Sequence, residues 1–591
     1  MKYLLILLLT LCPQVAVAAN QMAGHPSPYL ALHADDPVHW RSWDEIVFSE
    51  ARKDNRLVFL SIGYFSCHWC HVMQRESFKD TAVAGVLNRH FIAVKIDREL
   101  NPDLDRRLMN FVEKVRGAAG WPLNVFLTPD GYPVTGFTYL PRGQFLDVLN
   151  QLESAWRENH AEYASAAKTF FESALQDSDN QSFNAPQIPP DQLSDAFVSQ
   201  TMLVADELQG GFGETSKFPS VPQLDALLRI IGRDPGLDPD VGAFVRLTLD
   251  SMARRNLHDH VHDGFFRYTT DPDWETPHYE KMLYDNAQLA SLYLKAHQLW
   301  PEAGYADVAL RTLEFVETWL KHDDGGYMSS LSAVDADNRE GAAYLWTREQ
   351  LESYLDAAEL ARLDQLWPGK TRLGEFLVGP LIGNEASDPP GMDRRIRARL
   401  RTRAPDIPVD DKRLAAWNAM MLEALTLAAR HDDIYSKRAD RLYRYMRRAF
   451  LRADGSLRRL ADNDTVAAAV LEDYAQLAHA FLRYGQAFGD NDAIAQAAAI
   501  AGRAHELFVE DGRWRQKTDN FIPLDAPQWI IPDRVFFSPM TLWLQTALSV
   551  DGLDPAVRAS AESMLLRASR DMLDSPYFYG SYILLRITRG G

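Results

Sequence analysis

The most constraining feature of the sequence is a pair of cysteines three positions apart, Cys67 and Cys70, between an apolar run and a helical pattern. The third cysteine, Cys12, lies in an N-terminal apolar stretch. Two thiols at this spacing can close a disulfide within one helical turn or share a metal ion. Because such a short disulfide constrains almost no chain entropy, we expect its role to be chemical, with redox exchange the leading interpretation.

The N-terminus has the layout of a secretory signal. Lys2 precedes an apolar run over residues 3–11, and the small residues Ala16, Ala18 and Ala19 follow. The run is too short to span a bilayer. We therefore expect residues 1–19 to be removed from an exported protein, periplasmic in a two-membrane bacterium, with no membrane insertion after signal cleavage. Disulfides persist in such compartments.

The length of the chain predicts its number of domains, and its charge argues against one class of partner. A chain of 591 residues, 46% of them hydrophobic, predicts two or more domains, because single cores stop growing near about 250–300 residues. The 81 acidic and 62 basic residues give a formal net charge of −19. This acidic balance argues against nucleic acid as a partner.

Two regions differ in their periodicity. Residues 25–180 alternate buried strands, at 57–62, 91–96 and 123–127, with helical patterns, which predicts a small α/β domain. The proline-containing segment 181–190 predicts a linker. Residues 191–591 contain roughly twelve amphipathic stretches at helical period and few strand-like runs. Helical hairpins in such number predict a solenoid or a closed ring.

The position of Cys67 predicts a reactive thiol. It should lie at the amino end of the helix that continues through Met73, where unpaired backbone N–H groups and an imidazolium at His68 would stabilise a thiolate. We therefore predict that Cys67 is the exposed attacking sulfur and Cys70 the resolving one. The redox-active disulfide Cys67–Cys70 is then the redox group, and we expect no other cofactor and no metal.

Three alternatives to redox exchange remain open. Cys67, Cys70 and His71 form a C-x-x-C-H pattern, which is also the attachment pattern of c-type haem. The same residues could bind a metal ion, or the thiols could be inert and buried. Against haem, Pro122 precedes the third strand, where a thioredoxin fold places a cis-proline beside the thiols. The groove that receives a protein thiol or disulfide is then expected to be shaped by Trp69, Trp121 and Pro122.

Polar residues gather at the starts of several predicted helices in the second region. Such groups are costly to bury unless they pair with each other or bind a ligand. If they converge on a funnel, a histidine and carboxylates could transfer a proton at a sugar carbon or activate water at a glycosidic bond. The candidate site residues are His278, Glu280, Lys281, Asp285, Asp335, Asp337, Asp411, Lys412, Trp417, Asn418, Glu472 and Asp473.

Structural roles explain the same residues equally well. Lys281 and Asp285, four positions apart, could form an ordinary helical ion pair, and Glu280 could favour the start of the helix. Trp417 could stack on a sugar ring, but aromatic residues at helical spacing are more often part of a core. The sequence leaves both interpretations open.

Taken together, these motifs resemble a known family. The matching segments are residues 60–64, Cys67-His68-Trp69-Cys70-His71, residues 95–99, Gly120-Trp121-Pro122 with residues 123–131, Gly210-Gly211-Phe212-Gly213, residues 277–289, Asp335-Ala336-Asp337, Ala416-Trp417-Asn418 and Glu472-Asp473-Tyr474. They are similar to the spermatogenesis-associated-protein-20-like thioredoxin-domain proteins. Two places depart from the pattern: Ser61 stands where typical thioredoxins bury an acidic residue, and residues 537–540 replace a Pro-Ser-Gly-Asn motif.

The resemblance implies a multidomain α/β plus all-α protein, in which a thioredoxin-like domain precedes a six-hairpin glycosidase-like (α/α)6 toroid. That second fold is shared with glycosidases and sugar 2-epimerases. Two functions are expected from it. The first is an exported thiol–disulfide oxidoreductase that acts on protein thiols or disulfides. The alternative is a carbohydrate-active toroid, either an epimerase, a hydrolase or a glycan binder, with the thioredoxin-like domain as redox sensor or docking module.

Overall fold

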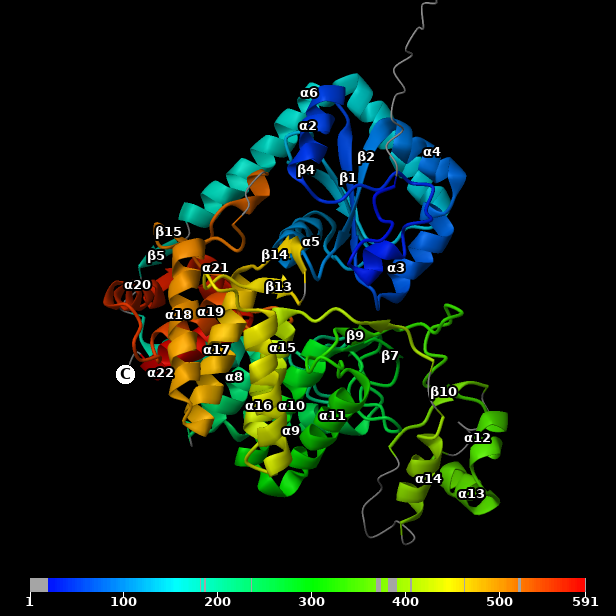
Figure 1. Ribbon diagram of the computed structural model, residues 1–591, viewed down its shortest axis with the longest axis vertical. Helices are drawn as coiled ribbons and strands as arrows, with labels where there is room; N and C mark the ends of the chain where they lie inside the picture. Colours follow the sequence, from blue (N-terminus) through cyan, green and yellow to red (C-terminus); the bar gives the residue numbers. More distant parts are fainter. Residues whose placement is uncertain are drawn as a thin grey trace, which may run out of the picture.

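The computed structural model describes residues 20–180, 182–184, 188–234, 236–367, 374–380, 391–403, 406–461, 463–518 and 522–589. The predicted signal, residues 1–19, lies outside the described residues. An α/β part lies at one end of the molecule and a larger helical part at the other (Figure 1). This division agrees with the two periodicities of the sequence.

The α/β part is built on a four-stranded sheet with strand order β2-β1-β3-β4. Strand β1 (Leu57–Gly63) is buried along its whole length, pairs in parallel with β2 (Phe91–Asp97) and runs antiparallel to β3 (Leu123–Leu127). Strand β4 (Pro133–Phe137) completes the sheet as a hairpin with β3. The helices of this part are α1 (Pro28–Ala31), α2 (Glu45–Asp54), α3 (His68–Met73) with the π-helical turn η1 (Gln74–Phe78), α4 (Thr81–His90) and α5 (Pro102–Arg116).

A long helix that the sequence did not predict joins the two parts. Helix α6 (Arg142–Asn180) runs along one side of the molecule (Figure 1) and contains non-helical backbone angles at Asn159. Strand β5 (Ser182–Asn184) follows and pairs with β17 (Arg567–Ser569), near the other end of the chain. The predicted linker at 181–190 is therefore partly a strand that pairs with the C-terminal region.

The helical part is a closed ring of hairpins. Each inner helix packs against the next, and α22 packs back against α8. The inner helices are α8 (Val221–Ile231), α10 (Leu283–Leu299), α15 (Ala415–Ala428), α17 (Leu471–Phe488), α19 (Pro539–Ala547) and α22 (Gly580–Arg589). Their outer partners, in the same order, are α9 (Pro239–Arg254), α11 (Tyr305–Trp319), α16 (Asp433–Ala449), α18 (Asn491–Phe508), α20 (Pro555–Leu565) and α7 (Pro190–Leu203). The described helices thus confirm the six-hairpin toroid.

Burial explains why the ring has two layers. The inner helices α10 and α15 are buried around almost their whole circumference, as expected for helices surrounded by partners. The outer helix α16 instead buries one stripe, including Tyr435, Leu442 and Met446, and exposes its charged residues.

Short strands and a side lobe decorate the ring. The strands are β6 (Tyr268–Thr269), β7 (Pro277–His278), β8 (Lys281–Met282), β9 (Ser330–Leu331), β10 (Leu345–Trp346), β11 (Phe376–Leu377), β12 (Val409–Asp410), β13 (Arg458–Leu460), β14 (Asn463–Ala468), β15 (Val509–Glu510) and β16 (Arg513–Trp514). A lobe of α12 (Arg348–Tyr354), α13 (Ala357–Leu366) and α14 (Met392–Leu400) projects to one side (Figure 1). The remaining short helices are η2 (Pro301–Ala303), η5 (Pro523–Asp525), α21 (Arg570–Asp574) and η6 (Pro576–Tyr579).

Buried ion pairs join the two parts. Lys412 of the toroid places Nζ 3.1 Å from carboxylate oxygens of both Asp97 and Glu99, and it also pairs with Asp410. Arg459 donates from Nε to the backbone oxygen of Glu99 at 2.8 Å. Because buried charges are tolerated only when they are paired, these contacts fix the α/β part on the ring.

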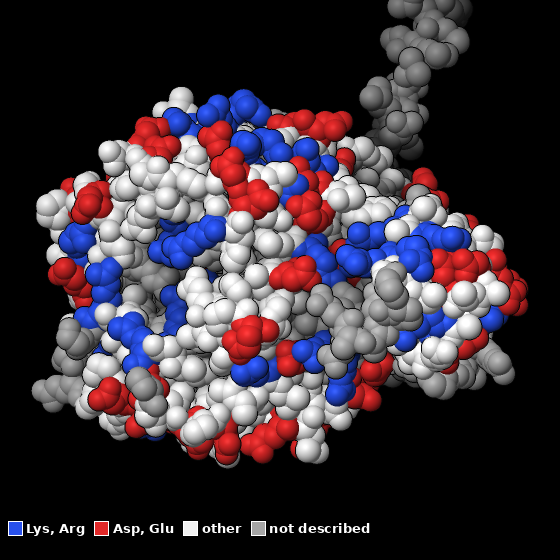
Figure 2. All heavy atoms as spheres, turned by 90° about the horizontal axis from the view of Figure 1, so that it is seen from below, with Lys and Arg blue, Asp and Glu red and all other residues white. Residues whose placement is uncertain are grey.

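The outer surface is mixed in charge. Basic and acidic side chains intermingle over the face opposite the α/β part (Figure 2). Such a mixed surface is typical of a solvated face. Among the described residues, no helix combines the length and the hydrophobicity that crossing a bilayer requires.

Candidate functional site

The two cysteines form a disulfide at the start of α3. Their Cα atoms are 5.3 Å apart, and Cys67 is the N-cap residue, with its Sγ accepting a hydrogen bond from the backbone N–H of Cys70 at 3.1 Å. The peptide bond between Trp121 and Pro122 is cis. The structure therefore confirms the predicted helix start and the predicted cis-proline.

The disulfide is buried, and the residue before it contacts the toroid. Cys67 is 3% exposed and Cys70 is 1% exposed, so the prediction of an exposed attacking sulfur is wrong for this closed arrangement. Ser66 donates from Oγ to Sδ of Met282 at 3.2 Å, and its backbone oxygen accepts from the N–H of Ala333 at 3.2 Å. The prediction failed because it considered the α/β domain without its partner.

Tyr64, three residues before Cys67, is attached to the toroid through its hydroxyl. This hydroxyl donates to Oε1 of Glu280 at 2.9 Å and accepts from Nη1 of Arg267. Arg267 and Glu280 also form an ion pair at 3.3 Å. The loop that leads to the disulfide is thus held by a buried, charge-assisted network.

The surroundings of His68 do not favour the charge that the sequence predicted. Burial lowers the pKa of His68, although Glu340 opposes the shift, so the expected imidazolium is disfavoured. Nε2 of His68 lies 3.4 Å from Glu340, and Nδ1 of His278 lies 2.6 Å from the same carboxylate. His278 is therefore beside the disulfide motif. The ring of His71 bonds through Nε2 to the backbone oxygen of Phe65 at 2.8 Å.

The three predicted groove residues do not form one surface. Trp69 is 42% exposed and packs its ring 4.9 Å from that of Tyr139. Trp121 instead faces a cavity, described below, and donates from Nε1 to Asp105 at 2.8 Å. Pro122 is buried. Among the described residues, no group of three or more His, Cys, Asp or Glu is arranged to hold a metal ion.

A buried lysine stands beside Ser61. Lys95 pairs with Ser61 across β1 and β2 and donates from Nζ to its Oγ at 2.9 Å. Its Nζ also lies 5.2 Å from the ring centre of Tyr29 and 4.6 Å from that of Phe78. Burial lowers the pKa of Lys95 to about 7, with Asp36 opposing the shift. Sequence reasoning noted the missing acid at Ser61 but not this amine, which the 95–99 motif contains.

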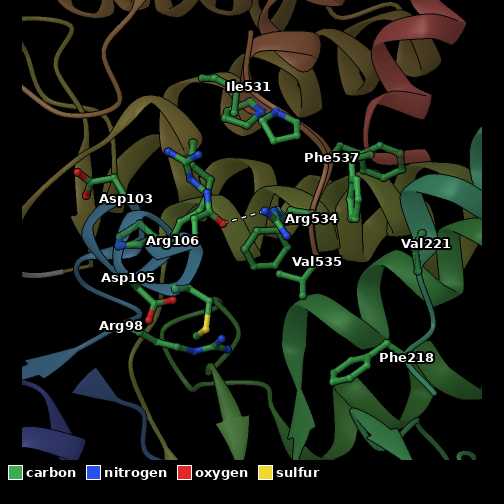
Figure 3. A pocket seen from close by; sticks show the side chains of 18 of the residues that line it. Arg98, Asp103, Asp105, Arg106, Phe218, Val221, Ile531, Arg534, Val535 and Phe537 are labelled. Carbon is green, nitrogen blue, oxygen red and sulfur yellow. Dashed lines mark hydrogen bonds between the residues drawn. The ribbon is translucent and has the colours of Figure 1, made fainter. Parts of the chain in front are cut away.

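A cavity of about 500 Å³ lies between α5 and the N-terminal ends of the inner toroid helices (Figure 3). The α/β part contributes Arg98, Glu99, Asp103, Asp105, Arg106 and Trp121, among others. The toroid contributes Phe218, Arg267, Asp285, Trp417, Arg459, Glu472, Arg534, Phe536 and Phe537, among others. Of the predicted toroid residues, Asp285, Trp417 and Glu472 line it. The arginines were not predicted as site residues, although Arg98 lies in the 95–99 motif.

Four carboxyl groups that line the cavity have a raised pKa. Burial raises the pKa of Glu99 although Lys412 opposes the shift. Burial raises the pKa of Asp285 to about 8 although Arg267 and Arg98 oppose it. Burial likewise raises the pKa of Glu472 to about 7 against Arg459, and that of Asp105 to about 6 against Arg98. Perturbed carboxyl groups in a cleft are typical of functional sites.

Several predicted residues are structural. Lys281 donates from Nζ to Asp259 at 2.7 Å and to the backbone oxygen of Asp263 at 2.8 Å. The expected ion pair with Asp285 is therefore wrong, because Lys281 belongs to β8 and precedes the helix. Asn418 bonds to backbone groups of Tyr327.

The other candidates lie outside the cavity lining. Asp473 caps α17 and forms a bidentate pair with Arg459 at 3.0 and 2.9 Å. Asp335 bonds within its own loop, and both Asp337 and Asp411 are exposed. Lys412 and Glu280 belong to the contact between the two parts, as described above.

Comparison with known proteins supports the resemblance seen in the motifs. The model of a domain family described as "Thioredox_DsbH: Protein of unknown function, DUF255" matches residues 19–175. Human spermatogenesis-associated protein 20 is 33% identical over 458 residues, 68% of this chain and 57% of that protein. The mouse protein of the same name is 34% identical over 71% of this chain and 59% of its own length. The chain thus spans less than two thirds of these relatives.

A third relative covers more of the chain. An uncharacterized protein of Caenorhabditis elegans is 29% identical over 95% of this chain and 81% of its own length. Among solved structures, a sugar epimerase from a ruminal bacterium matches 68% of this chain and 99% of its own, with 13% identity and a TM-score of 0.44. A structure titled DsbH oxidoreductase matches 20% of this chain and 85% of its own, with 16% identity and a TM-score of 0.17.

Proposed function

This chain is a homologue of spermatogenesis-associated protein 20, and from that premise we propose that it is an exported thiol–disulfide oxidoreductase with Cys67 and Cys70 as its redox couple. The observation that carries the proposal is the disulfide closed over the first turn of α3. On reduction, a thiolate at Cys67 keeps the hydrogen bond from the N–H of Cys70 and the positive end of the helix.

The exchange proceeds in two balanced steps. A client thiolate attacks Sγ of Cys67, forms a mixed disulfide with it, and displaces Cys70 as a thiolate. A second client thiolate then attacks the client sulfur and releases Cys67. The client dithiol becomes a disulfide, and the Cys67–Cys70 pair gains two electrons and, on protonation, two protons. The reverse sequence, which begins with attack by Cys67, reduces a client.

Burial of both sulfurs adds a requirement to this chemistry. A protein client reaches Sγ of Cys67 only when the toroid contacts at Tyr64 and Ser66 separate. Exchange is therefore coupled to movement at the contact between the two parts. The most direct test is the Cys70→Ser variant, which leaves Cys67 without its resolving partner.

We expect Cys70→Ser to accumulate a mixed disulfide with a disulfide-bearing client peptide, because the Cys67 thiolate attacks the client disulfide and displaces its second sulfur as a thiolate. The adduct is visible as a mass increase that reductant removes. The matched control is Cys67→Ser, which should trap far less adduct because the attacking sulfur is gone. If Cys70→Ser forms no adduct under either oxidising or reducing conditions, the exchange role is lost.

The cavity supports a second function, binding of a small carbohydrate, with the α/β part acting as redox sensor or docking module. Its volume of about 500 Å³ is within the usual range for small-ligand sites, about 300–1,000 Å³. It leaves Oδ2 of Asp285, Nε1 of Trp417 and Oε1 of Glu472 without a hydrogen-bond partner. Such buried groups are costly unless a ligand satisfies them.

A panel of sugars tests this second function by thermal unfolding. A bound sugar should raise the melting temperature, and Asp285→Asn should remove the rise because it changes a group that lines the cavity. His278→Ala is the control, since His278 lies beside the disulfide motif and should leave the rise intact. A flat response to the whole panel would overturn carbohydrate binding.

A further inference from the structure

Two arginines that line the cavity, Arg98 and Arg267, are buried and keep N–H groups without a hydrogen-bond partner. We propose that the ligand of this cavity is a sugar acid, whose carboxylate binds to Arg98 and Arg267 while its ring lies against the aromatic wall. The inference rests on the second proposed function, because it assigns the chemical class of the ligand in that same cavity.

Arg98 is a buried cation without a carboxylate partner among the described residues. It is 7% exposed, its Nη2 donates to the hydroxyl of Tyr284 at 3.3 Å, and its Nε has no partner. The guanidinium lies 4.1 Å from the ring centre of Tyr64 and 4.2 Å from that of Trp121. Figure 3 shows it extending into the cavity toward the side on which Phe218 lies. A buried guanidinium with a free N–H group favours an anion.

Arg267 adds a second cation at the same place. It is 2% exposed, and although Nη1 is used by Tyr64 and Glu280, both Nε and Nη2 lack partners. Its guanidinium carbon lies 5.1 Å from the ring of Tyr64 and 4.9 Å from the ring of Trp121, the two rings that Arg98 also covers. The two like charges repel each other. A bound carboxylate would relieve this repulsion and accept from both side chains.

Most carboxyl groups of the cavity already have partners. Glu99 is paired with Lys412 at 3.1 Å, and Glu472 lies 3.7 Å from Arg459. Glu113 lies 3.8 Å from Arg534, and Asp103 lies 4.0 Å from Lys517. Asp105 accepts from Nε1 of Trp121 at 2.8 Å.

Asp285 is the remaining carboxyl group, and its burial keeps it mainly protonated at neutral pH. Its protonated form can donate a hydrogen bond to a ligand.

The rest of the lining suits a hydroxylated ring. Trp121, Phe218, Trp417, Phe536 and Phe537 supply apolar faces on which a sugar ring can lie. Oδ2 of Asp285 and Nε1 of Trp417 have no hydrogen-bond partner. Cations on one side, apolar faces and separate polar atoms together match a sugar that carries one carboxylate.

The test compares acids with their neutral counterparts on the mature full chain by titration calorimetry. Glucuronate, galacturonate and mannuronate are matched with glucose, galactose and mannose, which differ only at the carboxylate. We expect at least one acid to bind ten or more times more tightly than its neutral partner. Arg98→Gln should remove at least tenfold of that affinity, and Arg98→Lys, which keeps the charge but not the fork, should recover part of it.

Arg438→Gln is the matched control, because Arg438 is paired with Glu314 at 2.6 Å on an outer helix and should change the affinity less than twofold. Equal binding of acids and neutral sugars overturns the inference and leaves carbohydrate binding standing. An acid preference that survives both Arg98→Gln and Arg267→Gln also overturns it. Failure of every sugar to bind overturns the inference together with the second proposed function. The comparison on the unaltered chain decides the matter even if a variant does not fold.

Discussion

The disulfide and the cavity lie at the same contact between the two parts of the molecule, but their polar groups are arranged in opposite ways. Around the disulfide, Tyr64 bonds to Glu280 and Ser66 bonds to Met282, so this side of the contact is closed by partners. Around the cavity, Arg98 and Asp285 keep polar atoms without partners. The disulfide can react with a client only after the contact moves. The polar groups around the cavity need a ligand to complete their hydrogen bonds.

One residue belongs to both regions. Arg267 bonds to Tyr64 on the disulfide side and also lines the cavity, with Nε and Nη2 left without a hydrogen-bond partner. Any change that loosens the contact between the two parts should therefore affect the disulfide and the cavity together, whereas changes on one side alone should separate them. The predictions that follow run from the largest expected effect to the smallest.

Lys412→Met should break both regions at once. It leaves the carboxylates of Asp97, Glu99 and Asp410 buried without their cation, a loss of about 3–5 kcal/mol in the free energy of unfolding. Denaturant unfolding measures this loss, and reduction of the disulfide should become faster. Lys437→Met is the control, since its exposed pair with Asp433 should contribute no more than about 0.5 kcal/mol. Equal effects of the two variants would contradict the account of the contact.

Lys95 lies on the disulfide side, and Lys95→Met should change how the free energy of unfolding depends on pH. The pKa of Lys95 is lowered from 10.5 to about 7, so between these values the unfolded chain binds more protons and stability rises with pH. From pH 7 to pH 9 the rise that is due to Lys95 should be about 2 kcal/mol, and the variant should lack it. Urea unfolding of both proteins at the two pH values measures the difference; parallel changes would show that Lys95 is not held neutral by burial.

Tyr64→Phe should weaken the contact at the disulfide without changing the cavity. It removes charge-assisted hydrogen bonds to Glu280 and Arg267, which together are worth about 1.5 kcal/mol or more, so reduction of the disulfide by a small thiol should be about tenfold faster. Tyr293→Phe, which loses a hydrogen bond to the backbone of Leu249 away from the contact, should leave the rate unchanged. A rate that does not respond to Tyr64→Phe would show that this contact does not limit access.

Trp69→Ala should have the smallest effect. The side chain is exposed and packs on Tyr139, so reduction by a small thiol should change by less than about twofold. A larger change, measured by alkylation of the released thiols, would return Trp69 to the role of groove residue that the sequence suggested.

Local features of the fold could be predicted, and contacts between distant residues could not. The apolar run at β1, the helix start at Cys67 and the hairpins of the toroid follow from periodicity and motif. Tyr64 and Ser66, just before Cys67, bond to Glu280 and Met282, more than two hundred positions away. The partner of Lys281 is Asp259, in a loop earlier in the chain, and no spacing rule indicates it.

The cavity shows the same limit. Asp285, Trp417 and Glu472 were predicted because they stand at the starts of inner helices, which converge at one end of a ring. Arg98 and Arg267 follow no such rule, since one comes after a strand and the other lies in a loop. Their common environment, the rings of Tyr64 and Trp121, exists only when the two parts are docked.

The central claim is that Cys67 and Cys70 are a working redox couple, and the most direct test is the intact mass of the mature protein after equilibration across glutathione poises and alkylation. The account predicts that two alkyl groups appear together, at a midpoint between about −120 and −270 mV, the range of known thiol–disulfide oxidoreductases. The midpoint would give the direction of exchange. If no thiol is released at any poise, or if the mass includes a haem or a metal ion, the claim is contradicted.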